Sequence, residues 1–406
     1  MPRLFQNEPI SAQMQPQERP TSPSQSTADP DSSLQSSLPA AMAAAASAAV
    51  SPPPHHGLPD EIFIWEILVR LPPKALLRCR AVCRAWRAAT SARDFLLAHH
   101  DRQPTLPFLH CFNFVGDEVD SLDIISFDHR AGVAAADQLQ TVARLGHAFF
   151  RPLASCDGLV VLAKNYARFS ICNPATRQYA PLPLLSGFIF LGMYPHGDGE
   201  YRLLLGPEAQ DGCFVYTLGS GEPPRHVDID CPAVAEEDLI YPSGSALFHG
   251  SLHLCIGNMI IAFNTTAESF REMRPPVDPW GADLFEMDGM LGMSICNAAM
   301  TSIDIWRMQD YESEVWALKY RVELPVAEFG NFSIHWWVVV VSPDGHVLVL
   351  VKVDDRLLQI DVDGKLVASF HRRVLGPARH RLKQTLVPHT LFPELEGYVV
   401  NSLPFL

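Results

Sequence analysis

Hydrophobic and polar positions divide the chain into three stretches with different patterns. Residues 1–57 consist mainly of Ser, Pro, Gln and Ala, residues 58–103 carry apolar side chains at helical spacing, and residues 104–406 carry short apolar runs of strand length. A stretch with few large apolar residues cannot bury enough surface to offset the entropy of ordering. The pattern therefore predicts a disordered tail (1–57), a small all-α module (58–103) and a large all-β domain (104–406). A Ser- and Ala-rich start is also typical of a plastid transit peptide, but four acidic residues against two arginines favour a low-complexity tail.

The helical stretch is divided by its prolines. A first helix is expected from about Asp60, and Pro72-Pro73 stops it because proline lacks a backbone N–H and clashes with the preceding turn. A second helix is expected from Pro73 towards residue 82, and a third from about residue 83 to residue 89. The first helix is apolar nearly all round, more than a unit of roughly 45 residues can bury within itself. This excess predicts docking on another protein or on the rest of the chain.

Residues 104–406 are predicted to form strands without long helices between them. Apolar runs alternate with turn residues such as Asp363-Gly364, a sequence typical of hairpins. The runs lie at 158–163, 168–172, 201–205, 213–218, 251–255, 259–263, 302–306, 315–319, 337–341, 346–351, 356–361 and 365–370. The lack of long amphipathic helices argues against a parallel sheet with helical crossovers.

A weak internal repeat groups these strands. A glycine-containing turn before an apolar strand recurs at Gly158, Gly250, Gly289 and Gly345. The first interval spans two repeats, so the average repeat is about 47 residues, the length of a four-stranded propeller blade. The period predicts a β-propeller of six blades, with seven as the alternative, and a closed ring leaves only short sheet edges exposed. The other architecture compatible with the pattern is a pair of β-sandwiches.

Charge is unevenly distributed along the chain. There are 31 Lys and Arg against 45 Asp and Glu, a formal net charge of −14. Residues 58–103 hold eight basic and five acidic residues, whereas residues 104–406 carry a net charge of −15. Such acidity argues against nucleic-acid binding, which relies on a positive surface. No run reaches the ~18 apolar residues of a membrane helix, and nine dispersed cysteines without a C-x-x-C pair favour the reducing cytoplasm or nucleus.

The first two helices and the start of the third resemble an F-box. The resemblance runs without a gap through LPDEIFIWEILVRLPPKALLRCRAVCRAW, residues 58–86. It includes the opening Leu-Pro, the paired Ile-Leu and Leu-Leu positions of the two helices, and the Val-Cys-x-x-Trp ending at Trp86.

A second resemblance lies in residues 155–183. Cys156-Asp157-Gly158-Leu159 and Asn173-Pro174-Ala175-Thr176-Arg177 are similar to motifs of the F-box-associated domain of plant F-box proteins. Read from its residues alone, the second motif predicts a turn between two strands of one blade, with peptide binding by Arg177 as the alternative. Together the resemblances imply a non-catalytic substrate receptor of a Skp–cullin–F-box ubiquitin ligase. Its F-box would bind the Skp adaptor, and through it a cullin, while the second domain would bind a protein target.

The resemblance also implies which residues contact the adaptor, namely the opening Leu-Pro and apolar positions of the first two helices. Carried onto this chain, these are Leu58, Pro59, Ile62, Ile67, Leu68, Leu71, Pro72, Leu76 and Leu77. Some of these side chains can instead hold the helices together, and for Leu68, Leu77 and Trp86 both interpretations stay open. Phe63 and Trp65 stand at positions that are usually more polar in the family, so the sequence does not assign their role.

Signals for enzymatic or metal chemistry are weak. No GxGxxG, GxxxxGK[ST] or GxSxG string occurs. His249 and His253 flank a turn rather than sharing a helix face, which does not suit a metal pair. Asp361-x-Asp363-Gly364 resembles the start of a calcium loop, but Arg372 stands where the loop requires Glu. The sequence therefore predicts no catalytic residue, cofactor or metal.

Three functional hypotheses follow, from different classes. The first is the adaptor-linked receptor for ubiquitination of a protein target, with no role for nucleic acid or a membrane. The second is an interaction scaffold that acts without ubiquitin transfer. The third is a propeller enzyme acting on a sugar or another small molecule, which the missing catalytic clusters disfavour.

Overall fold

The structure is a computed structural model that describes most of the chain from residue 59 to the last residue, 406. The gaps in this description are 117, 131–132, 134, 147–148, 165–167, 183–184, 198, 208–211, 228–244, 327–335 and 343–344. The predicted disordered tail, residues 1–57, and the predicted contact residue Leu58 lie outside the described residues.

The helical module consists of short helices. They are α1 (Asp60–Ile62), η1 (Phe63–Ile67), η2 (Leu68–Arg70), α2 (Pro73–Cys79), α3 (Arg84–Ser91) and α4 (Arg93–Arg102). The predicted first helix is continuous but changes from α to π to 3₁₀ geometry before it ends ahead of Pro72. Pro73 is the first residue of α2, as expected from its fixed φ. The fourth helix was not predicted, because the apolar residues of α4 form no clear periodic stripe.

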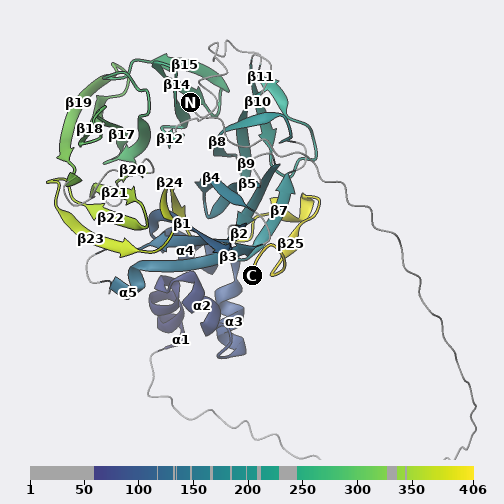
Figure 1. Cartoon of the computed structure of the whole chain (residues 1–406). Coiled ribbons are helices and arrows are strands. Elements are labelled where there is room, and N and C mark those ends of the chain that lie inside the picture. The colour runs from purple at the N-terminus through teal and green to yellow at the C-terminus, as the bar shows by residue number, and fades with distance from the viewer. Residues whose placement is uncertain are drawn as a thin grey trace, which may run out of the picture. The chain divides into compact units, whose positions relative to one another are not determined.

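The remainder forms six antiparallel sheets, the blades of a β-propeller (Figure 1). The strands are β1 (Thr105–Val115), β2 (Glu118–Phe127), β3 (Leu139–Gly146), β4 (Phe150–Cys156), β5 (Leu159–Lys164), β6 (Arg168–Asn173), β7 (Gln178–Leu182), β8 (Phe188–His196), β9 (Glu200–Pro207), β10 (Cys213–Thr217), β11 (Arg225–Val227), β12 (Ala246–Phe248), β13 (Ser251–Ile256), β14 (Met259–Asn264), β15 (Ser269–Met273), β16 (Asp283–Met287), β17 (Met290–Cys296), β18 (Ser302–Asp310), β19 (Val315–Glu323), β20 (Trp336–Val341), β21 (Leu348–Val353), β22 (Arg356–Ile360), β23 (Leu366–His371), β24 (Leu375–Lys383) and β25 (Val399–Val400). Two one-turn helices, α5 (Ala135–Gln138) and α7 (Leu391–Glu394), accompany them. The prediction of a helical module followed by a six-bladed propeller is confirmed, and the seven-bladed and β-sandwich alternatives are wrong.

The ring closes by joining the two ends of the propeller. Strand β24 pairs with β1 and becomes the first strand of the blade β24-β1-β2-β3 (Figure 1). Thr105 stands opposite Lys383 in this pairing. The other five blades are built from consecutive strands, and β25 adds to the outer edge of the blade β4–β7.

Apolar residues fill the spaces between neighbouring blades. Along β5, Leu159, Val161 and Ala163 pack towards the blade β8–β11, whereas Val160 and Leu162 pack towards the closing blade. A strand buried on both faces needs no polar alternation, which explains the uninterrupted apolar runs of the sequence. Six such interblade clusters complete the ring.

The repeated glycine turns occupy equivalent positions in four blades. Gly158, Gly250, Gly289 and Gly345 each lie between the first and second strands of their sheets. The double interval that follows Gly158 contains the blade β8–β11, whose corresponding connection joins β8 to β9. The repeat predicted from the sequence is therefore the blade repeat of the structure.

Candidate functional site

The core of the helical module is made by residues from η2, α2 and α4. Leu68, Val69, Leu76 and Phe95 are almost completely inaccessible to solvent and form one cluster. His99 of α4 stabilises this core, since its Nε2 lies at hydrogen-bond distance, 2.8 Å, from the carbonyl oxygen of Leu71. Two of the predicted adaptor contacts, Leu68 and Leu76, thus have their side chains inside the module.

Other members of the predicted contact set are exposed on the surface of the module. Ile62, Ile67 and Leu77 are 41%, 38% and 40% exposed, large fractions for such side chains. Pro59 and Pro72 are exposed as well, and Leu71 is half-buried. The apolar excess that the sequence indicated is therefore exposed on the surface of the module.

The two aromatic residues without an assigned role have structural partners. Phe63 stacks on Trp86 with ring centroids 5.3 Å apart, and Trp65 packs at 5.6 Å from Phe95. Trp86 itself is half-buried. Phe63 and Trp65 therefore fasten the first helix to α3 and α4 through one side of each ring.

The module is attached to the propeller through a linking segment, residues 383–387, which begins at the last residue of β24. Leu386 is buried in the same cluster as Leu68 and Leu76, and Val387 and Ala175 pack against it. Thr385, almost fully buried, accepts a hydrogen bond from the backbone N–H of Val387 at 3.1 Å. The core of the helical module is thus completed by a segment that lies about 300 residues further along the chain.

The first sequence motif, Cys156–Leu159, forms the turn on which the linking segment lies. A Cβ atom added to Gly158 would come within 2.5 Å of the Thr385 side chain and 2.8 Å of the Lys383 carbonyl oxygen. The neighbouring Asp157 accepts a hydrogen bond from the Tyr201 hydroxyl at 3.1 Å. Its other carboxylate oxygen lies 4.0 Å from Nε2 of His100 in α4.

That contact between His100 and Asp157 is not a strong ion pair. Burial lowers the pKa of His100, the charge of Lys383 lowers it further, and the carboxylates of Asp157 and Asp101 only partly oppose this. His100 is therefore mainly neutral at neutral pH. The attachment of the helical module to the propeller depends on packing and hydrogen bonds rather than on charge.

The second motif, Asn173–Arg177, is the predicted turn between β6 and β7. The Asn173 side chain accepts hydrogen bonds from the N–H groups of Ala175 and Thr176, at 3.0 and 3.3 Å. Its Nδ2 donates to the Thr385 carbonyl oxygen at 3.3 Å. Both sequence motifs thus belong to one blade, β4–β7, and both contact the linking segment that carries the helical module. The sequence indicated turns at these positions but held no signal for this shared contact.

Replacing Gly158 by Ala should destabilise the protein more than the same change at Gly250. Both glycines have positive φ, +81° and +69°, and occupy equivalent turns, so both changes carry a backbone penalty of about 1 kcal/mol. Only Gly158 faces the linking segment, whereas nothing lies within 4 Å of a Cβ at Gly250. The additional overpacking should cost about 1–3 kcal/mol, measurable by denaturant unfolding. Equal losses for the two variants would contradict the close contact with residues 383–385.

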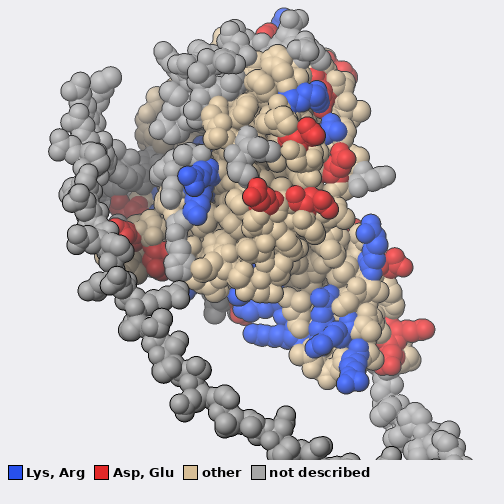
Figure 2. All heavy atoms as spheres, turned by 90° about the vertical axis from the view of Figure 1, so that its right-hand side faces the viewer, with Lys and Arg blue, Asp and Glu red and all other residues tan. Residues whose placement is uncertain are grey.

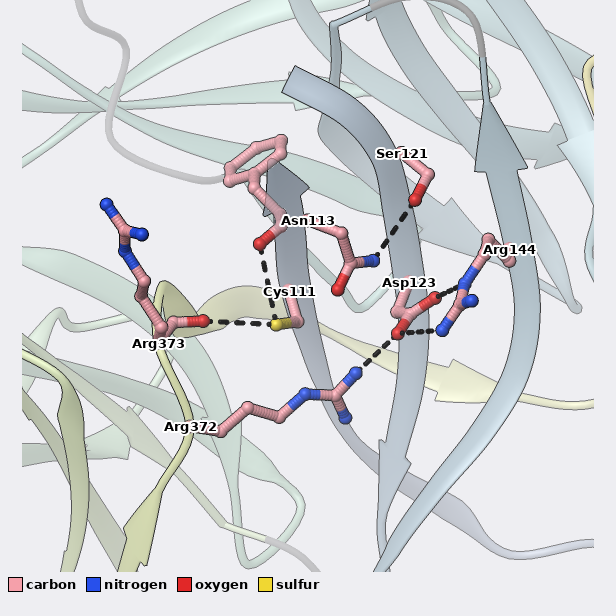
Figure 3. Close-up of polar contacts among 8 residues, drawn as sticks. Cys111, Asn113, Ser121, Asp123, Arg144, Arg372 and Arg373 are labelled. Carbon is pink, nitrogen blue, oxygen red and sulfur yellow. Dashed lines mark hydrogen bonds and ion pairs between the residues drawn. The ribbon is translucent and has the colours of Figure 1, made fainter. Parts of the chain in front are cut away.

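A buried carboxylate and two partly exposed arginines hold the closing blade together (Figure 3). Asp123, on β2, is completely buried and accepts hydrogen bonds from Arg144 on β3, at 2.6 and 3.0 Å. Arg372, in the link between β23 and β24, also pairs with this carboxylate. Cys111, opposite Asp123 on β1, donates its thiol hydrogen to the Arg373 carbonyl oxygen at 3.3 Å. The cluster therefore connects the link that precedes β24 to strands β2 and β3 of the closing blade.

The two arginines keep Asp123 ionised. Burial alone would raise the pKa of the carboxyl group, but the hydrogen bonds and positive charge of Arg144, together with the charge of Arg372, outweigh burial and lower it. Because this carboxylate is paired with two arginines of the same chain, the cluster has the properties of a structural interaction rather than of an active site.

The described residues contain no group of three or more His, Cys, Asp or Glu side chains arranged to hold a metal ion. His253, which the sequence placed beside a turn, is buried, with its Nε2 2.8 Å from the Tyr311 hydroxyl and its Nδ1 3.3 Å from the Ala246 carbonyl oxygen. Among the helices that the structure describes, none is long and apolar enough to cross a membrane.

Comparison with protein families agrees with this architecture. Residues 113–358 match the family described as F-box associated beta propeller domain, and residues 56–102 match the F-box-like family. The first match covers more than half of the chain, so the protein belongs to the F-box associated beta propeller domain family. It is a plant-type F-box protein, in which the F-box is the helical module described above.

Relatives of known sequence are F-box proteins of Arabidopsis thaliana. F-box protein CPR1 is 24% identical over 357 residues, which cover 75% of this chain and 82% of that protein. F-box protein At5g49610 is 23% identical over 302 residues, which cover 66% and 79%. Among solved structures, a protein of unknown function from Bacteroides caccae aligns with 67% of this chain and 99% of its own, with 9% identity and a TM-score of 0.40, too distant to bear on function.

Proposed function

We propose that this protein is the substrate-receptor subunit of a Skp–cullin–F-box ubiquitin ligase. The observation that carries the proposal is the exposed apolar surface of the F-box, to which Ile62, Ile67 and Leu77 contribute. Such a surface on a small module is typical of a protein interface. The Skp-type adaptor would cover this surface and connect the protein to a cullin.

The predicted contact residues then have two roles. Pro59, Ile62, Ile67, Leu71, Pro72 and Leu77 would touch the adaptor directly, together with Leu58. Leu68 and Leu76 would act from inside the module by fixing the positions of α2 and η2. Both groups would be needed for binding, but only the first would leave the fold unchanged when it is substituted.

The propeller would hold a protein target and have no catalytic role of its own. Two turns of the blade β4–β7 attach the propeller to the F-box. This attachment would keep the target at a fixed position relative to the adaptor. A receptor of this kind would work in the cytoplasm or nucleus, where its cysteines stay reduced.

The proposal is tested by changing the exposed surface and a matched surface elsewhere. Ile62→Asp and Ile67→Asp should abolish co-purification with a recombinant plant Skp-type adaptor and cullin, because each places a charge in an apolar interface. Leu318→Asp, on the outer strand β19, changes a side chain of nearly equal exposure, 41%, and should leave binding intact.

All three variants should keep the melting temperature of the wild type, since each replaced side chain is substantially exposed. Adaptor binding that survives both F-box changes would refute the proposed interface. Binding without transfer of ubiquitin to any protein held by the propeller would instead indicate a scaffold.

A further inference from the structure

A groove lies beside the F-box, where α2 faces strand β3, the β6–β7 turn and the last residues of the chain. Its volume is about 1420 Å³, whereas small-molecule sites usually measure about 300–1,000 Å³. Its size therefore suits a segment of polypeptide better than a metabolite.

The groove is basic although the chain as a whole is acidic. Five cationic side chains line it, Lys74, Arg78, Arg80, Arg144 and Arg177, against the single acidic side chain of Asp137. Figure 2 shows Lys and Arg gathered at the lower end of the molecule, the level of the helical module in Figure 1. A surface of this sign attracts acidic segments, whereas the remainder of this acidic protein repels them.

Three of these cations are available to a ligand. Arg144 is held by Asp123, and Arg80 donates to the hydroxyl and carbonyl oxygens of Thr90. Within the described part of the chain, Lys74, Arg78 and Arg177 have no recorded ion pair.

The position of Arg177 is fixed by its turn. Its φ of +54° belongs to the tight turn that Asn173 stabilises, and its carbonyl oxygen accepts a hydrogen bond from the N–H of Asn401 at 3.0 Å. A backbone that is already ordered loses little conformational entropy when the guanidinium binds a carboxylate. This turn brings a cation of the propeller to the edge of the F-box.

The groove is also continuous with the surface assigned to the adaptor. Pro72 and Leu77, both in the proposed contact set, line it as well. A partner that covers these two residues therefore reaches Lys74 and Arg78 on the same helix, and Arg177 lies across the groove. Continuity thus favours the adaptor over a separate ligand as the occupant.

We propose that the groove receives an acidic segment of the Skp-type adaptor, so that the adaptor binds Arg177 of the propeller as well as the F-box. The proposal rests on the proposed function above and extends its interface. The adaptor would then contact both the F-box and the propeller. Its contact with Arg177 would involve a residue that an isolated F-box lacks.

The test is a titration of the full chain with a recombinant plant Skp-type adaptor at low and high salt. Arg177→Glu should weaken binding about tenfold at low salt, and the difference should shrink as salt screens the charges. Arg177→Lys should retain most of the affinity. Lys319→Glu, an exposed charge reversal on β19, serves as the matched control and should change nothing.

A second measurement identifies the occupant directly. A carbodiimide joins an amine to a carboxylate that touches it, so Lys74 should be cross-linked to an acidic residue of the adaptor, and Lys74→Arg should remove the cross-link. Unchanged affinity for Arg177→Glu, or cross-links only to a target or to residues 1–57 of this chain, would overturn the proposal. Loss of binding in Ile62→Asp together with unchanged binding in Arg177→Glu would reject the groove while leaving the proposed function in place. Full binding by Ile62→Asp would reject the proposed function itself.

Discussion

Replacing Asp123 by Asn should lower the free energy of unfolding by about 3 kcal/mol. The substitution removes a buried carboxylate, so its two arginine partners lose the negative charge that compensates them. The change keeps the size of the side chain but removes the charge that Arg144 and Arg372 share. Because these arginines lie on β3 and on the link to β24, the loss should loosen the closure of the ring. Denaturant unfolding at neutral pH measures the effect.

Asp304 provides the matched control for this experiment. It pairs with Arg321 across β18 and β19 through two hydrogen bonds of 2.6 and 2.8 Å, nearly the same geometry as Asp123 with Arg144. The two arginines are similarly exposed, 49% for Arg144 and 58% for Arg321, but the Asp304 side chain is 22% exposed whereas that of Asp123 is fully buried. An ion pair in contact with solvent contributes only about 0–1 kcal/mol. If Asp304→Asn destabilised the protein as much as Asp123→Asn, burial would not be the source of the effect.

The contribution of Asp123 should also depend on pH. The pKa of this carboxyl group is lowered in the folded protein, whereas in the unfolded chain it is about 3.9. The ionised form therefore stabilises the fold fully above that value, and the contribution is lost as the pH falls through the lower folded pKa. The difference in stability between wild type and Asp123→Asn should accordingly narrow below about pH 4.

Leu76→Ala should destabilise the F-box, whereas Leu77→Ala should not, although the residues are adjacent. Leu76 is completely buried in the F-box core, and its truncation should destabilise the module by about 2–5 kcal/mol. Leu77 is 40% exposed, so its truncation should change stability by less than about 0.5 kcal/mol. If the adaptor covers Leu77 as proposed, that variant should bind it about tenfold or more weakly.

Hydrogen exchange separates the two outcomes. Faster exchange confined to α2, α4 and the linking segment is expected for Leu76→Ala, and unchanged exchange is expected for Leu77→Ala. Adaptor affinity should fall in both variants, in the first because the module opens and in the second because a contact is lost. Protection lost equally in both would contradict the different burial of the two side chains.

The sequence was sufficient to predict the ring and twelve of the 25 strands that the structure describes. Interblade packing buries both faces of a strand such as β5, so the strand appears as an uninterrupted apolar run. Four of the blades repeat the glycine turn that Gly158 and Gly345 represent. Short-range signals could not show that β1 and β24 share a blade, because the pairing of Thr105 with Lys383 is a long-range contact. Counting repeats therefore left the number of blades between six and seven.

Prediction of the site was limited for a related reason. Composition marks Leu76 and Leu77 as equally apolar, and only the packing of α4 and the linking segment decides which of them is buried. Leu386 showed no signal of belonging to the F-box core, since it lies far from the module in the sequence. The two family motifs were recognised as turns, but their shared contact with residues 383–387 required the folded ring.

Completion of the F-box core by Leu386 has a consequence for synthesis on the ribosome. Leu386 is translated about 310 residues after Leu76, which corresponds to about 15–60 s at the usual elongation rates. During that interval the nascent F-box lacks Leu386, and the ring that positions this residue lacks the strand β24 that closes it. A product of interrupted translation would thus display an F-box with an incomplete core. If the F-box binds a Skp-type adaptor as proposed, its complete core would be available for that binding only after residue 386 has been translated.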